Sequence, residues 1–259
     1  MNKLYKAFEN GKAFIPFVTA GDPNLDVTER LVLAMAQAGA DLIELGIPFS
    51  DPVAEGPVIQ QADERALAAG TTTDLLFDMV SRVREKTDVP LAFMTYANPI
   101  FVYGADKFMR RCAACGVDAV IVPDLPFEEK DELAPACQAH DVKLISLIAP
   151  TSQSRIKKIA AEAEGFVYCV SSLGVTGVRS QITTDISRMI AEVKAVCDIP
   201  CAIGFGISAP EQAREMAAVA DGVIVGSAIV KMVAQYGERC VKPVADYVRE
   251  MKKATQSGE

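Results

Sequence analysis

A short pattern that joins a helix end to an apolar strand recurs along this chain, and it constrains the fold most. The copies read AGADLI at 38–43, CGVDAV at 115–120, AVADGV at 218–223 and, more loosely, AHDVKL at 139–144. In each copy a helical stretch ends, the chain turns tightly, and an apolar run begins. Repeated βα units of this kind build a parallel sheet.

Eight apolar strands can be placed at the spacing that βαβ units require, with one wider gap after the second. The expected strands are Ala13–Thr19, Leu42–Gly46, Leu91–Tyr96, Ala119–Pro123, Lys143–Ile148, Phe166–Val170, Ala202–Phe205 and Gly222–Val225. Eight units in 259 residues predict an α/β fold, a single (β/α)8 barrel with a short N-terminal helix at 4–9. A doubly wound open sheet is the alternative, but Gly21-Asp22-Pro23 stands where its glycine fingerprint would follow the first strand. We expect one domain, 1–259.

The composition argues against several classes of partner. A formal net charge of −8 disfavours a nucleic-acid or anionic membrane surface. No apolar run approaches the roughly 20 residues that span a bilayer, and the N-terminus lacks a signal-peptide pattern. We therefore expect a cytoplasmic protein. The seven cysteines are scattered, and we interpret them as reduced, mostly buried residues.

The second expected strand carries a carboxylate in its middle. Glu44 lies among apolar neighbours, and the loop that leaves this strand adds Asp51 and Glu55. Burying a carboxylate is costly, and an apolar environment raises its pKa, so Glu44 could deliver a proton. A core glutamate paired with a cation is the structural alternative. For Asp51, an Asx-turn that holds the loop is equally plausible.

Glycines gather in the loops after the sixth, seventh and eighth strands. They include Gly174, Gly177, Gly204, Gly206 and Gly226, the last followed by Ser227. Glycine lets backbone N–H groups approach an anion, and a helix that begins at Ser227 would direct its dipole there. This is the usual phosphate site of such barrels. We also expect Ser208 and Glu211 to cap the next helix.

The remaining candidates define an apolar pocket and a lid. Phe17, Ile59, Met94, Tyr96 and Ile121 could form a pocket wall near the acids, and residues 174–177 could close over it. The single histidine, His140, falls at a helix end on the opposite face of the barrel, so we interpret it as structural. No cluster has the spacing of a metal site.

Several motifs together resemble the tryptophan synthase α subunit family. They are ELGIPFSDPVAEGP at 44–57, GVTG at 174–177, GFGIS at 204–208 and GSAIV at 226–230, supported by FVTAGDP at 17–23 and YAN at 96–98. The resemblance covers the chain in order. It implies a lyase that cleaves indole-3-glycerol phosphate to indole and glyceraldehyde 3-phosphate in tryptophan biosynthesis.

The resemblance also implies residue roles. Glu44 matches the general acid/base, Glu55 the second catalytic carboxylate, Tyr168 a tyrosine beside them, and Thr176 the lid threonine. The phosphate site matches Gly177, Gly204, Phe205, Gly206, Gly226 and Ser227. One departure is that the best-known members have Asp at the position of Glu55.

The family's α subunit works with a β subunit that uses pyridoxal phosphate, in a heterotetramer of two α and two β subunits. The resemblance implies no cofactor in this chain, and it places Asp51, Asn98 and Asp124 on the contact face. Two alternatives stay open: another phosphosugar barrel, which would need a catalytic lysine or a metal-binding histidine pair, and a weakly catalytic phosphate-binding subunit that activates its partner.

Overall fold

The structure, a computed structural model, describes residues 2–149, 153–170, 179–204 and 206–256, without the side chains of 153 and 179–185. Within them, eight parallel strands close into a barrel in chain order, because β1 pairs with both β2 and β8. The strands are β1 Ala13–Thr19, β2 Ile43–Gly46, β3 Leu91–Met94, β4 Ala119–Ile121, β5 Lys143–Ile148, β6 Val167–Val170, β7 Cys201–Gly204 and β8 Gly222–Val225.

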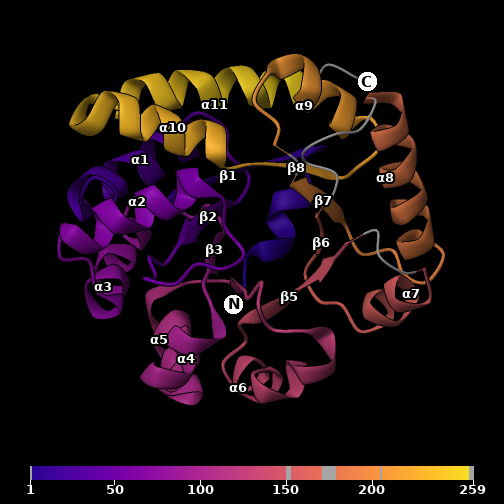
Figure 1. Ribbon diagram of the computed structural model, residues 1–259, viewed down its shortest axis with the longest axis horizontal. Coiled ribbons are helices and arrows are strands. Elements are labelled where there is room, and N and C mark those ends of the chain that lie inside the picture. The colour runs from indigo at the N-terminus through magenta and orange to yellow at the C-terminus, as the bar shows by residue number, and fades with distance from the viewer. Residues whose placement is uncertain (1, 150–152, 171–178, 205, 257–259) are drawn as a thin grey trace.

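Helices surround the strands as a ring (Figure 1). The α-helices are α1 Leu25–Gln37, α2 Pro57–Ala68, α3 Thr73–Arg84, α4 Ala97–Tyr103, α5 Ala105–Cys115, α6 Ala134–Ala139, α7 Gln153–Ala161, α8 Arg179–Lys194, α9 Pro210–Ala217, α10 Ser227–Tyr236 and α11 Val241–Gln256. The 3-10 helices are η1 Leu4–Phe8, η2 Phe127–Glu132 and η3 Gly237–Arg239. In the part of the chain described, no helix has the length and apolarity to cross a membrane.

The predicted (β/α)8 barrel is confirmed, with small differences at the strand ends. β1, β5 and β8 match their predicted bounds. β3 ends at Met94 because Tyr96 already occupies the N-cap of α4. The wide gap after β2 is explained by two helices, α2 and α3, in place of one. The short N-terminal helix is the 3-10 helix η1.

Local sequence signals set the boundaries of individual helices, as α1 illustrates. The Asn24 side chain accepts a hydrogen bond from the backbone N–H of Val27 at 2.9 Å, which caps the first turn. Such a cap is worth about 1 kcal/mol. Past the last turn, Gly39 has a φ of +101°, a conformation that glycine adopts without strain. The apolar face of α1 packs Leu31 and Met35 into the core.

The N-terminal segment closes one end of the barrel. Leu4 and Ala7 of η1 pack with the inward-facing residues of the barrel, and the Phe8 and Phe166 rings lie 5.5 Å apart. The N-terminus accordingly lies inside the helical ring in Figure 1. Because η1 fills the end where the strands begin, the opposite end, where the strands finish, is left for a site.

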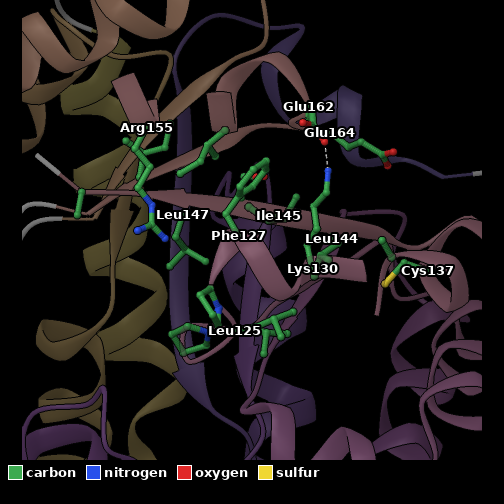
Figure 2. A pocket seen from close by; sticks show the side chains of 18 of the residues that line it. Leu125, Phe127, Lys130, Cys137, Leu144, Ile145, Leu147, Arg155, Glu162 and Glu164 are labelled. Carbon is green, nitrogen blue, oxygen red and sulfur yellow. Dashed lines mark hydrogen bonds and ion pairs between the residues drawn. The ribbon is translucent and has the colours of Figure 1, made fainter. Parts of the chain in front are cut away.

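The helical layer is incomplete outside β5. Leu144 and Ser146 face away from the barrel and are only half-buried, and a cavity of about 360 Å³ lies over them between η2 and α7. Two ion pairs cross it: Glu128–Arg155 joins η2 to α7, and Lys130–Glu162, shown in Figure 2, joins η2 to the residue that follows α7. This opening, the β5 seam, is lined by apolar and charged residues and contains none of the candidate catalytic residues.

Candidate functional site

A cavity of about 560 Å³ opens at the end of the barrel where the strands finish. Residues of β1, β2, β3, β6, β7 and β8 reach it, together with the loop after β2 and helices α2, α10 and α11. Its lining consists of Phe17, Glu44, Glu55, Ile59, Met94, Tyr168, Gly204, Gly206, Ile207, Ser208, Ile224, Gly226, Ser227, Ala228, Lys231, Met232 and Tyr247. Of the predicted residues, two acids, three members of the apolar wall and four phosphate-site residues therefore line one cavity: Glu44 and Glu55, Phe17, Ile59 and Met94, and Gly204, Gly206, Gly226 and Ser227.

Glu44 is an isolated carboxyl group inside the barrel. Glu44 lies on β2, where it pairs with Phe17 of β1 and Ala92 of β3 in the sheet, and it is 0% exposed. Neither carboxylate oxygen has a hydrogen-bond partner among the described residues. Burial, followed by the charge of Glu55, raises the pKa of Glu44 to about 8. The group is therefore protonated at neutral pH and can donate its proton into the cavity.

Glu55 lies on the loop between β2 and α2, which neighbouring side chains hold in place. The Ala54 N–H donates a hydrogen bond to the Tyr96 hydroxyl at 2.9 Å, and the Gln60 side-chain amide donates to the Glu55 carbonyl at 2.8 Å. Burial raises the pKa of Glu55, though its side chain remains half-buried. Tyr96 therefore contacts this loop but does not line the cavity.

Tyr168 comes from β6 and requires a glycine on the neighbouring strand. A Cβ atom at Gly204 would lie 2.6 Å from the Tyr168 hydroxyl, so only glycine leaves room for the ring. Burial, followed by the charges of Glu44 and Glu55, raises the pKa of Tyr168 well above its usual value. The phenol keeps its proton and can donate a hydrogen bond beside the two acids.

The opposite rim of the cavity has the features of an anion site. α10 begins at Ser227 with Gly226 at its N-cap, so its unpaired N–H groups and the positive end of its dipole face this rim. Gly206 has a φ of +49°, and a Cβ atom there would meet open space. An approaching phosphate would meet bare backbone at both positions.

The predicted cap at Ser208 and Glu211 is wrong. The N-cap of α9 is Ala209, and the Gln212 side-chain oxygen accepts from the N–H groups of Ser208 at 2.9 Å and Ala209 at 3.1 Å. Pro210 lies in the first turn of α9, where its missing backbone N–H costs no hydrogen bond, because N–H groups at this position have no partner within the helix. This shift leaves Ser208 on the rim, where the Tyr247 hydroxyl donates to its carbonyl at 3.1 Å.

Sequence reasoning missed several residues of this cavity. Lys231 lies one helical turn after Ser227 and adds an exposed cation to the phosphate rim. Its i, i+4 spacing from Ser227 was a usable signal. Met232 of α10 and Tyr247 of α11 also line the cavity, but only the packing of α11 brings Tyr247 there.

The other sequence candidates lie elsewhere. Ile121 points into the barrel below the cavity and, like Tyr96, does not line it. Thr176, Gly177 and Phe205 lie outside the described residues. His140 follows α6 on the opposite face, with Nε2 2.9 Å from Asp106 Oδ1. Among described side chains, no group of three or more His, Cys, Asp or Glu residues could hold a metal ion.

The free energy of unfolding should fall as pH rises through the neutral range. Burial raises the pKa of Glu44 from 4.5 to about 8, so between these values the folded protein holds a proton that the unfolded chain has released. Glu44 stabilises the fold fully below pH 4.5, and this contribution is lost as pH approaches 8. The loss amounts to about 1.4 kcal/mol per pH unit.

Urea denaturation at about pH 5.5 and about pH 8.5 measures this slope. We expect Glu44 alone to account for about 3 kcal/mol of the loss in wild type across the interval, so Glu44→Gln, which cannot ionise, should lose less than wild type by about that amount. Asp63, whose pKa burial raises to about 7, contributes in the same direction in both proteins. A wild-type free energy of unfolding that stays level or rises over this interval would contradict the burial of an uncompensated Glu44.

Comparison with known proteins gives one consistent result. The family model described as tryptophan synthase alpha chain matches residues 4–256. The tryptophan synthase alpha chain of Lacticaseibacillus casei is 48% identical, with 99% of this chain and 97% of that protein covered. The tryptophan synthase alpha chain of Halalkalibacterium halodurans is 50% identical, with 94% of this chain and 92% of that protein covered. The crystal structure of tryptophan synthase subunit alpha from Legionella pneumophila superposes with a TM-score of 0.90 at 37% identity, covering 99% of each chain.

Proposed function

The chain belongs to the tryptophan synthase alpha chain family, lyases that cleave indole-3-glycerol phosphate, and we propose that Glu44 and Glu55 carry this reaction in the cavity described above. The observation that carries the proposal is the state of Glu44. It is a buried, protonated acid without a hydrogen-bond partner among the described residues, in a cavity whose other rim can bind an anion. A substrate with an aromatic ring and a phosphate fits such a mouth.

The proposed reaction begins with a proton transfer. Glu44 donates its proton to the indole carbon that bears the glycerol chain, and the ring acquires a positive charge that spreads to its nitrogen. Glu55, as a carboxylate, stabilises that charge. Glu44, now ionised, takes the proton of the adjacent side-chain hydroxyl. The carbon–carbon bond then breaks, its electron pair restores the indole ring, and the hydroxyl carbon becomes the aldehyde.

Neighbouring groups would position the substrate. Phe17, Ile59 and Met94 supply apolar contacts for the indole ring, and Tyr168 can donate a hydrogen bond near the acids. The phosphate would rest on Gly204, Gly206, Gly226 and Ser227, with Lys231 adding a positive charge. Tyr96 would act through the loop that carries Glu55. We retain Ile121 as a second-layer wall, Gly177 and Phe205 as phosphate contacts, and Thr176 as the lid residue.

The proposal extends to a partner, a cytoplasmic β subunit of tryptophan synthase in a heterotetramer of two α and two β subunits. Support comes from exposed apolar side chains beside Asp51 and Asn98: Val53 is 83%, Val102 81% and Phe101 47% exposed. Asp124 accepts a hydrogen bond from the Ala97 N–H at 2.9 Å, which ties the neighbouring loop to α4. We assign pyridoxal phosphate to the β subunit, because carboxylates suffice for the proton transfers here.

Indole release from indole-3-glycerol phosphate, measured with and without added β subunit, tests the function. We expect slow release by the chain alone and faster release with the partner. Glu55→Gln should lower kcat by about 100-fold, as expected for losing one charge-stabilising group, whereas Glu55→Asp, which restores the residue of the best-known members, should keep most activity. Phosphate-ligand binding without indole release under either condition would instead support the weakly catalytic binding subunit.

A further inference from the structure

The loop between β7 and α9 forms part of the anion rim with few restraints on its backbone. Among the described residues, no backbone–backbone hydrogen bond holds 206–208. Gly206 has no side chain to anchor it, and the nearest anchor is Ile207, which is 3% exposed. Ordering a loose backbone when a ligand arrives costs free energy and weakens binding. A loop that presents N–H groups to a phosphate therefore needs support from other elements.

Tyr247 of α11 and Gln212 of α9 provide this support. α11 packs against α9 and α10 (Figure 1), and Tyr247 lines the same cavity as Gly206 and Ser208. The Tyr247 hydroxyl donates to the Ser208 carbonyl at 3.1 Å. The Gln212 side-chain oxygen accepts from the Ser208 N–H at 2.9 Å and from the Ala209 N–H at 3.1 Å. Side chains from two helices thus hold Ser208 at both its carbonyl and its N–H.

The Tyr247 hydroxyl is well placed to act as a permanent donor. Val244 and Val248, on either side of it in α11, are fully buried, so this part of the helix is fixed against the core. Burial, followed by the charge of Glu250, raises the pKa of Tyr247 to about 12, so the phenol keeps its proton at neutral pH. A carbonyl oxygen on the rim repels an anion, and a donor bound to the Ser208 oxygen reduces that repulsion.

We propose that Tyr247 is a positioning residue of the phosphate site: from α11 it holds the loop 206–209 through the Ser208 carbonyl, so that the bare backbone at Gly206 is in place before the phosphate arrives. This inference rests on the proposed phosphate site. The phosphate is remote from the carbon–carbon bond that breaks, so losing the restraint weakens binding in the ground state and the transition state alike. Such a loss raises KM and leaves kcat unchanged.

Tyr247→Phe removes the hydroxyl and keeps the ring. With the α and β subunits together, KM for indole-3-glycerol phosphate should rise about fivefold at unchanged kcat, as expected for one lost hydrogen bond. The inhibition constant of inorganic phosphate should rise by a similar factor, and amide hydrogen exchange across 207–209 should accelerate. Tyr236→Phe, at the far end of α10 from Ser227, removes another tyrosine hydroxyl and should change none of these.

Gln212→Ala shows whether Tyr247 acts through the loop. This substitution releases the Ser208 and Ala209 N–H groups and leaves the Tyr247 side chain in place. If both side chains act by holding the same loop, the rise in KM of the double variant should be smaller than the product of the two single effects. A rise equal to that product would mean that Tyr247 contacts the phosphate independently of the loop, and would overturn the positioning role.

The remaining outcomes separate this inference from the proposed function. Unchanged KM in Tyr247→Phe, or unchanged hydrogen exchange across 207–209, would also overturn the positioning role. If the wild-type complex released no indole, the proposed function would fail. Hydrogen exchange would still decide whether Tyr247 holds the loop, because this measurement needs no turnover.

Discussion

Glu44→Gln should lower kcat for indole release by about 1000-fold, the range expected when a general acid is removed. Glutamine has nearly the same shape, but its amide cannot donate a proton to carbon at a useful rate. The loss corresponds to about 4 kcal/mol of transition-state stabilisation. Substrate KM should change little, because Glu44 meets the ring and not the phosphate.

Two measurements make the Glu44 result interpretable. Circular dichroism and urea denaturation should show an intact fold, with equal or greater stability above neutral pH, since the substitution removes a buried ionisable group. Glu64→Gln, an exposed position on α2, serves as the control for loss of an acid. Turnover by Glu44→Gln within a few-fold of wild type would exclude Glu44 as the proton donor.

Gly206→Asp should abolish substrate binding, and it is the second large effect. A Cβ atom at this position meets open space, so the aspartate would place its negative charge on the rim of the anion site. Repulsion of a dianionic phosphate in a partly enclosed site should raise KM by at least about 100-fold, equivalent to roughly 3 kcal/mol. Inhibition by inorganic phosphate should disappear in parallel.

Gly206→Asn is the matched control for the charge. Asparagine has the same size as aspartate and tolerates the positive φ of +49° found at this position. It should therefore raise KM far less than aspartate does. Equal effects of the two substitutions would attribute the loss to backbone strain or bulk, and unchanged affinity in Gly206→Asp would refute the phosphate site.

The fold could be predicted because its signal is repeated. Each βα unit carries its own turn and apolar run, so errors at single strands do not change the count. Strand ends were less predictable, because they depend on pairing with neighbouring strands and on the helix or loop that comes next in the chain. Tyr96 follows an apolar run and was predicted to end the third strand, but it occupies the N-cap position of α4. Its hydroxyl accepts a hydrogen bond from the Ala54 N–H in the loop after β2.

Residues of the site could be predicted where they interrupt the apolar pattern of a strand or follow its end. Glu44 stands out as a charge inside an apolar strand, and the glycines stand out at the ends of β7 and β8. Lys231 was missed because it lies on the exposed face of an ordinary amphipathic helix, and Tyr247 because only the packing of α11 brings its half-buried side chain to the cavity.

The β5 seam has a consequence for how sequence change is distributed over this barrel. The cavity is lined from β1, β2, β3, β6, β7 and β8, whereas β4 and β5 contribute no lining residue. The poorly covered strand, β5, therefore lies on the side of the barrel that does not line the cavity. Salt, which screens the two ion pairs across the seam, should loosen η2 and α7 while indole formation continues. Substitutions in η2 or α7 should therefore have little effect on indole release.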